Sequence, residues 1–146
     1  MTVKQISVFV ENRPGQLLEF TKLLEKHNID LRALSIAEAE DFGILRVIVD
    51  DSYNTMQILK ESGYVCSVTS VLAVEIPDRP GSLVKILDAL GKGGVNLEYT
   101  YAFLSRKQNS AYMILRVADN EKAIEVLRAC GVQPVCQENV GALFGN

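Results

Sequence analysis

Short alternating apolar runs and longer runs with helical spacing follow one another along the chain. Residues 6–10 alternate, with every second apolar side chain on one face, as in a half-buried strand. Between Leu17 and Leu24 the apolar residues recur at the spacing of an amphipathic helix. The pattern therefore predicts a strand and a helix, joined by the four residues Asn12–Gly15.

The rest of the first half completes a larger unit. A strand pattern begins at residue 29 and continues to about residue 38, where an acidic turn precedes a second, strongly apolar strand over 44–49. Ser52 and the preceding pair Asp50-Asp51 are candidate caps for a second helix that ends near Gly63, and residues 64–68 are strand-like. The predicted order is strand, helix, strand, strand, helix, strand.

The second half repeats this order. Residues 71–76 are strand-like, Asp78–Gly81 forms the turn, and apolar residues over 83–90 predict a helix. Two further strands, a helix that Asn120 can cap, and a last strand at 135–136 follow. The same arrangement of elements thus occurs twice in 146 residues.

The repetition holds residue by residue, which indicates an internal duplication. At an offset of 66 the segment Arg13–Gly15 recurs as Arg79–Gly81, and several apolar positions around it are identical. Ile44–Val47 recurs as Ile114–Val117 at an offset of 70, which predicts about four extra residues around Ser105–Asn109. We therefore expect two domains, residues 1–69 and 70–146, with no flexible linker between them.

Composition narrows the function classes. The net charge of −3 and the pI near 5.2 give no electrostatic footprint for nucleic acid or an anionic membrane. No apolar run is long enough to span a bilayer, and no signal peptide is visible, so a cytoplasmic protein is expected. The three cysteines lack a Cys-x-x-Cys spacing, which favours reduced thiols and predicts neither a metal site nor a disulfide framework.

The two loops, in their strand-loop-helix setting, carry a family resemblance. Residues 8–17 and 74–83, with the later segments Asn28–Asp30 and Gly94–Asn96, resemble the ACT domain, a small regulatory module that senses amino acids. The resemblance covers essentially the whole chain. It implies an α+β fold of two ferredoxin-like βαββαβ domains side by side, with antiparallel sheets and helices on one face.

The resemblance also implies a ligand site, and its chemistry is intelligible. A helix N-terminus presents unpaired N–H groups that suit a carboxylate, and the loop glycine lets a ligand approach the backbone. Asn12 or Asp78 can accept from an ammonium group, while Asp30 or Asn96 can approach from a neighbouring domain, because ACT ligands commonly lie between two domains. The implied ligand-binding residues are Asn12, Arg13, Pro14, Gly15, Gln16, Leu17, Asn28, Ile29, Asp30, Asp78, Arg79, Pro80, Gly81, Ser82, Leu83, Val95, Asn96 and Leu97.

The two copies differ in ways that leave their equivalence open. Asn12 is neutral where Asp78 is charged, and His27-Asn28 is replaced by Gly93-Gly94. A neutral Asn12 does not repel a carboxylate, which favours the first loop as the working site. The alternative for both loops is a tight turn that simply starts a helix.

The function expected from this resemblance is that of a stand-alone sensor. It would bind a free amino acid, need no cofactor, form a homodimer and regulate amino-acid metabolism allosterically. The alternative is a regulatory subunit of an amino-acid metabolic enzyme, similar to the small subunit of acetolactate synthase. Catalysis is not expected, because the single histidine, His27, has no convergent set of acids, bases or nucleophiles.

Overall fold

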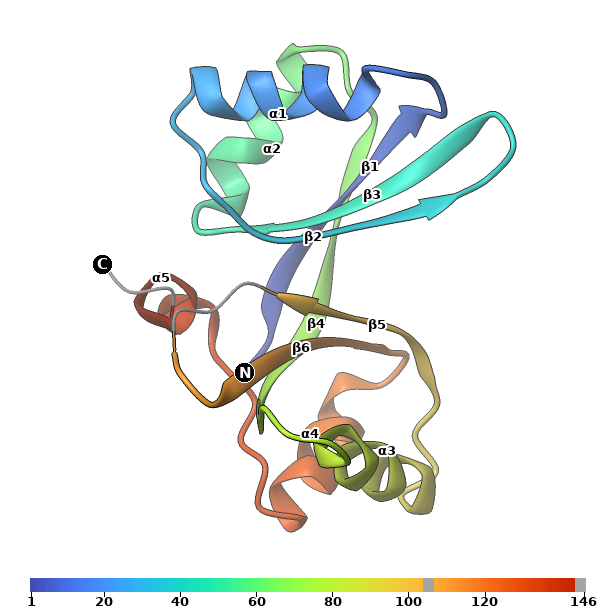
Figure 1. Cartoon of the computed structure of the whole chain (residues 1–146), viewed down its shortest axis with the longest axis vertical. Helices are drawn as coiled ribbons and strands as arrows, with labels where there is room; N and C mark the ends of the chain where they lie inside the picture. The colour runs from blue at the N-terminus through green and yellow to red at the C-terminus, as the bar shows by residue number, and fades with distance from the viewer. Residues whose placement is uncertain (104–106, 144–146) are drawn as a thin grey trace. The chain divides into compact units, whose positions relative to one another are not determined.

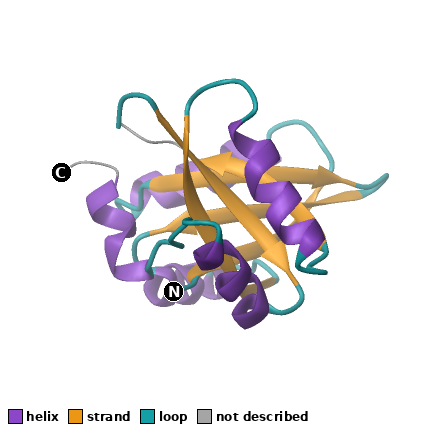
Figure 2. Cartoon of the chain, turned by 90° about the horizontal axis from the view of Figure 1, so that it is seen from below, coloured by secondary structure: helices purple, strands orange, loops and turns teal. Residues whose placement is uncertain are grey.

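The structure is a computed structural model that describes residues 1–103 and 107–143 (Figure 1). The chain divides into two compact units. The N-terminal unit is Lys4–Thr69, and the C-terminal unit is Met1–Val3 together with Ser70–Asn146. Figure 2 separates the helices and strands of the described chain by colour. None of the described helices combines the length and the apolar character needed to cross a membrane.

In the N-terminal unit, two helices cover one face of an antiparallel sheet, with α1 and α2 on the same side of the strands (Figure 1). Strand β3 lies between β1 and β2. Ile6 and Val8 of β1 pack against Phe20 and Leu24 of α1 in a core from which water is excluded, as their alternation predicted. The elements are β1 (Val3–Glu11), α1 (Gln16–Lys26), β2 (Leu31–Glu38), β3 (Phe42–Val49) and α2 (Ser52–Glu61).

The C-terminal unit repeats this arrangement, with β6 lying between β4 and β5. The predicted last strand at 135–136 is wrong. Its place is taken by a single bridge between Val74 and Pro134 and one bond from the Val135 N–H to the Ala73 carbonyl, because proline has no N–H to extend a ladder. The elements are β4 (Cys66–Pro77), α3 (Ser82–Lys92), β5 (Leu97–Phe103), β6 (Ser110–Val117), α4 (Asn120–Ala129), a 3-10 turn η1 (Gln137–Asn139) and α5 (Val140–Leu143).

The order of elements confirms the predicted fold class, an α+β fold with two ferredoxin-like units. One detail of the chain is different. The strands predicted over 64–68 and 71–76 form one continuous strand, β4, to which both units contribute residues. A strand interrupted only by the polar residues Thr69 and Ser70 has no turn signal that would end it.

The predicted hairpin insertion of about four residues is also corrected. Ala37 pairs with Ile44, and the equivalent residue Phe103 pairs with Tyr112, so the second hairpin is two residues longer than the first. The offset between the units is therefore 66 before this hairpin and 68 after it. The recurrence of Ile-Leu-Arg-Val at an offset of 70 suggested an alignment that is shifted by two residues. A shift of two residues is one period of a strand, so each side chain stays on the same face of the sheet and the hydrophobic pattern does not reveal the shift. Residues 104–106 of the predicted insertion lie outside the described part of the chain.

The four long helices start in two different ways. Asp51 and Asp119 cap α2 and α4, each accepting a backbone N–H of the first turn at 3.0 and 3.1 Å. Of the predicted caps, Asp51 is confirmed, whereas Ser52 and Asn120 are the first helical residues. Helices α1 and α3 follow Gly15 and Gly81, which have φ of +87° and +85°, and they have no side-chain cap. The helices that leave their first N–H groups free of a cap are thus those that follow the two loops.

Candidate functional site

The loop before α3 borders a pocket of about 690 Å³ in the C-terminal unit. A volume of this size suits a small-molecule ligand. Four of the residues implied by the family resemblance line it: Arg79, Pro80, Gly81 and Ser82. The other lining residues are Glu75, Ile76, Pro77, Lys85, Ile86, Asn109, Ser110, Gly131, Val132 and Gln133.

One wall of this pocket is a carboxylate. Glu75 accepts hydrogen bonds from the Ser110 hydroxyl at 2.7 Å and the Tyr112 hydroxyl at 3.0 Å, and it pairs with Lys107. The hydrogen bond from Lys107 is the main reason why the pKa of Glu75 lies below its ordinary value. Glu75 is therefore ionised at neutral pH and held in place by three donors.

The loop and the beginning of α3 contribute positively charged residues to this pocket. Arg79 and Lys85 are exposed, and neither forms an ion pair with another described residue. The Ser82 hydroxyl oxygen is buried and has no hydrogen-bond partner in the described chain. A buried hydroxyl without a partner is unfavourable, so this side of the pocket has unused capacity to bind an anion.

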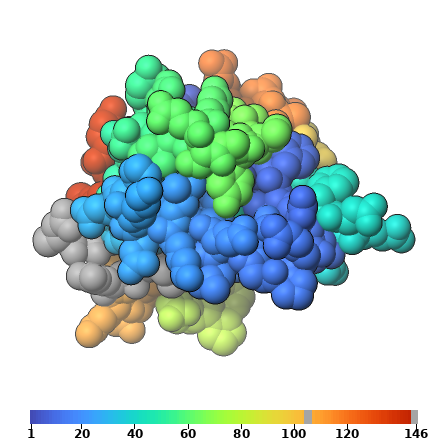
Figure 3. Space-filling view, turned by 90° about the horizontal axis from the view of Figure 1, so that it is seen from above, coloured from blue at the N-terminus to red at the C-terminus, as the bar shows by residue number. Residues whose placement is uncertain are grey.

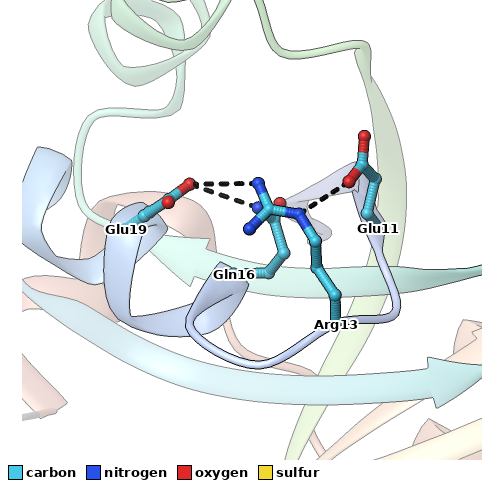
Figure 4. A network of polar contacts seen from close by, with 4 residues as sticks. All are labelled: Glu11, Arg13, Gln16 and Glu19. Atoms are coloured by element: carbon cyan, nitrogen blue, oxygen red, sulfur yellow. Dashed lines mark hydrogen bonds and ion pairs between the residues drawn. The ribbon is translucent and has the colours of Figure 1, made fainter.

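The first loop is different, because its own carboxylates occupy its arginine (Figure 4). Arg13 donates to Glu11 at 2.7 Å and lies 3.8 Å from a Glu19 oxygen. Gln16 donates to the same Glu19 oxygen at 3.2 Å. The hydrogen bond to Glu11 is also the main cause of a raised pKa for Arg13. The pocket at this loop has a volume of only about 110 Å³.

Asn12 is held by the neighbouring hairpin turn. Its side-chain amide donates to the carbonyl oxygens of Ala39 at 3.1 Å and Glu40 at 3.4 Å. This exposed turn, cyan in Figures 1 and 3, projects from the surface of the N-terminal unit. The amide that was expected to help bind a ligand at the first loop therefore ties the loop to the β2–β3 turn.

Two substitutions between the repeats explain the contrast between the loops. At the offset of 66, Pro77 stands where the N-terminal unit has Glu11, and Lys85 stands where it has Glu19. Arg79 therefore has neither of the acidic partners of Arg13. The loop sequences are nearly the same, but one neighbouring acid is lost and the other is replaced by a base.

The helix-to-strand turns lie away from these pockets. Asn28, Ile29 and Asp30 line a separate pocket of about 460 Å³ at the other end of α1. An 11-residue helix separates that end from the first loop by about 16 Å. In the C-terminal unit, Val95 and Leu97 pack against the core. Within each unit, the predicted loop residues and the predicted turn residues therefore do not line a common pocket.

Two charged residues of the pocket, Glu75 and Lys85, and the polar residues Asn109 and Gln133 were not among the site residues expected from the sequence. Lys85 could have been recognised from the sequence, because it is the residue equivalent to Glu19 in the alignment of the two repeats. Asn109 and Gln133 come from distant parts of the chain, and only the fold brings them to the loop. Pro14 and Gly15 do not line the small pocket at the first loop, and Asp78 and Leu83 do not line the large one.

Comparisons with known proteins agree with this architecture. A crystal structure of a protein from Bacteroides thetaiotaomicron matches at a TM-score of 0.89 with 40% identity over 96% of each chain. The ligand-free regulatory subunit of aspartate kinase from Thermus thermophilus matches at 0.67 with 17% identity, over 89% of this chain and 91% of that one. That subunit from Thermus flavus matches at 0.62 with 14% identity, over 90% and 94%.

A search of curated proteins found no match. The two aspartate kinase subunits are less than 25% identical to this chain, so they support the fold alone. The family model described as "ACT domain pair" matches residues 1–144, nearly the entire sequence. The chain therefore belongs to the ACT domain pair family.

Proposed function

We propose that this ACT domain pair is a regulatory sensor that binds a free amino acid in the pocket beside Arg79–Ser82. The observation that carries the proposal combines three features: a helix start without a side-chain cap, an arginine that forms no ion pair with a described residue, and a buried Ser82 hydroxyl without a partner in the described part of the chain. Each of these groups is a donor, and Arg79, Gly81 and Ser82 line the same pocket. They suit the carboxylate that every free amino acid carries.

The ammonium end of the ligand suits Glu75, which lines the same pocket. The ammonium group of an amino acid needs an acceptor, and Glu75 is an ionised carboxylate that lines the same pocket. A carboxylate has about four acceptor sites, of which Lys107, Ser110 and Tyr112 use three. One acceptor site is left for the ligand. The pocket thus offers donors and an acceptor to a zwitterion.

Regulation requires that the ligand has different affinities for two states of the protein. In this proposal the two states differ in association, either of two copies of the chain or of the chain with an amino-acid metabolic enzyme. Light scattering after size-exclusion chromatography, with and without ligand, tests the first case. Copurification with a large enzyme subunit supports the second, in which the protein is a regulatory subunit.

The binding step is tested by thermal unfolding in the presence of each of the twenty amino acids. We expect one or a few of them to raise the midpoint temperature, since a ligand at 100 times its Kd stabilises the folded state by about 2.7 kcal/mol. Arg79→Gln should remove most of this shift. Lys92→Gln removes a positive charge from the far end of α3 and should keep it. No shift with any amino acid contradicts the proposal.

A further inference from the structure

We propose that the pocket of the C-terminal unit selects a ligand with two carboxylates, an acidic amino acid, and that Lys85 determines this preference. The inference rests on the proposed function and adds the ligand class to it. It follows from a comparison of the two loops within the same molecule. In the N-terminal unit a side chain of that unit, Glu19, is the anion beside the loop arginine. Among the described residues of the C-terminal unit, no side-chain carboxylate pairs with the equivalent arginine, Arg79.

The carboxylate of Glu19 marks where an anion sits beside such a loop. It lies 3.8 Å from the guanidinium of Arg13 and accepts from Gln16, so it occupies the space between the loop arginine and the first turn of the helix (Figure 4). The equivalent positions in the C-terminal unit are Arg79 and Ser82. There Arg79 and Ser82 line the large pocket, and no side-chain carboxylate of the described chain pairs with Arg79. A ligand carboxylate would take the role of the Glu19 carboxylate as the anion beside the loop arginine.

Lys85 then presents a second positive charge. It lies three residues after Ser82 on α3, so the two side chains lie on one face of the helix. Among the described residues that line the pocket, Glu75 is the only acid and Arg79 and Lys85 are the only bases. Lys107 already compensates the charge of Glu75. A neutral amino acid would leave one of the two bases without a partner, whereas an acidic amino acid pairs with both.

The test compares ligands that differ only in this charge. Isothermal titration calorimetry with glutamate against glutamine, and with aspartate against asparagine, should show that an acid binds at least about tenfold more tightly than its amide, the strength of one charge-assisted hydrogen bond. Lys85→Gln should remove the difference between acid and amide, and Lys92→Gln should preserve it. Amides that bind as tightly as the acids overturn the inference and leave the proposed function intact.

Two further ligands separate the inference from the proposed function. Succinate has two carboxylates and no amine. If it binds in a Lys85-dependent way while no amino acid does, the preference for two carboxylates holds and the amino-acid sensor is wrong. Inorganic phosphate tests whether any compact anion suffices. Phosphate that binds as tightly as glutamate, with equal loss in Lys85→Gln, contradicts the inference.

Discussion

A single buried tyrosine connects the candidate pocket to the sheet. Tyr112 is fully buried and donates to Glu75 at 3.0 Å. Burial, followed by the hydrogen bond to Glu75 and then by the charge of Glu75, raises the pKa of Tyr112 to about 12. The phenol is therefore held neutral in the folded protein, and it positions the acid that lines the pocket.

This raised pKa predicts a loss of stability at high pH. Because the folded pKa exceeds the unfolded value of 10.0, the stabilisation is complete below pH 10 and is lost as the pH rises through about 12. Urea unfolding across this range should show the wild type losing on the order of 2 kcal/mol more than Tyr112→Phe. The other four tyrosines are common to both proteins, so their effects cancel. If the wild type and Tyr112→Phe lose stability equally as the pH rises, the assignment of the raised pKa to Tyr112 is wrong.

Two glycines, one just before helix α3 and one inside it, differ in the backbone conformation that they adopt. Gly81, at its start, has φ of +85°, whereas Gly91 lies inside the helix with open space where a Cβ would lie. From the sequence, the loop glycine was expected to let a ligand approach the backbone. The structure adds that the positive φ itself favours glycine at this position. A clash is not the reason, because a Cβ at Gly81 would meet no atom within 4 Å.

Alanine at these two positions should therefore act in opposite directions. Gly81→Ala should cost about 1 kcal/mol, because a left-handed conformation is strained for a residue with a Cβ. Gly91→Ala should stabilise the protein by about 0.5–1 kcal/mol, because alanine loses less conformational freedom in a helix. Urea unfolding of both variants measures the difference. Equal effects would mean that the loop relaxes, and the argument from the positive φ would be wrong.

At the scale of elements, most of the fold could be predicted from sequence. Hydrophobic periodicity located the strands and helices, because each buries one face. The choice between neighbouring candidate residues for one structural role was harder to predict. Asp51 and Ser52 are both good caps, and only the geometry shows that the aspartate bonds the first turn. The failed strand at 135–136 had the right apolar residues, but Pro134 prevents a ladder.

The candidate site was less predictable than the fold. The loop motif pointed to both loops and, through Asn12, towards the first. The difference between the loops comes from two positions outside the motif. The N-terminal unit has Glu11 and Glu19 there, and the C-terminal unit has Pro77 and Lys85. A sequence comparison shows these substitutions, but that Glu19 reaches the loop arginine depends on side-chain geometry. The remaining lining residues converge only through the fold.

For the whole molecule, this difference predicts one occupied loop per chain. With saturating ligand, hydrogen exchange should slow at the amides of residues 79–86, because ligand contacts close the first turn of α3. The equivalent amides, residues 13–20, should exchange at the same rate with and without ligand. Mass spectrometry of peptic fragments resolves the two segments. Protection at both loops would show that the ion pairs of Arg13 do not exclude a ligand.

The exchange of Glu19 for Lys85 also has a genetic meaning. In the standard code, glutamate and lysine codons differ only in their first base. After a gene duplication, one point mutation at this position therefore suffices to reverse the charge beside a loop arginine. A tandem gene can in this way keep one half as a closed scaffold while the other half acquires a new ligand preference. Such a step leaves the hydrophobic pattern of both halves, and therefore their folding, untouched.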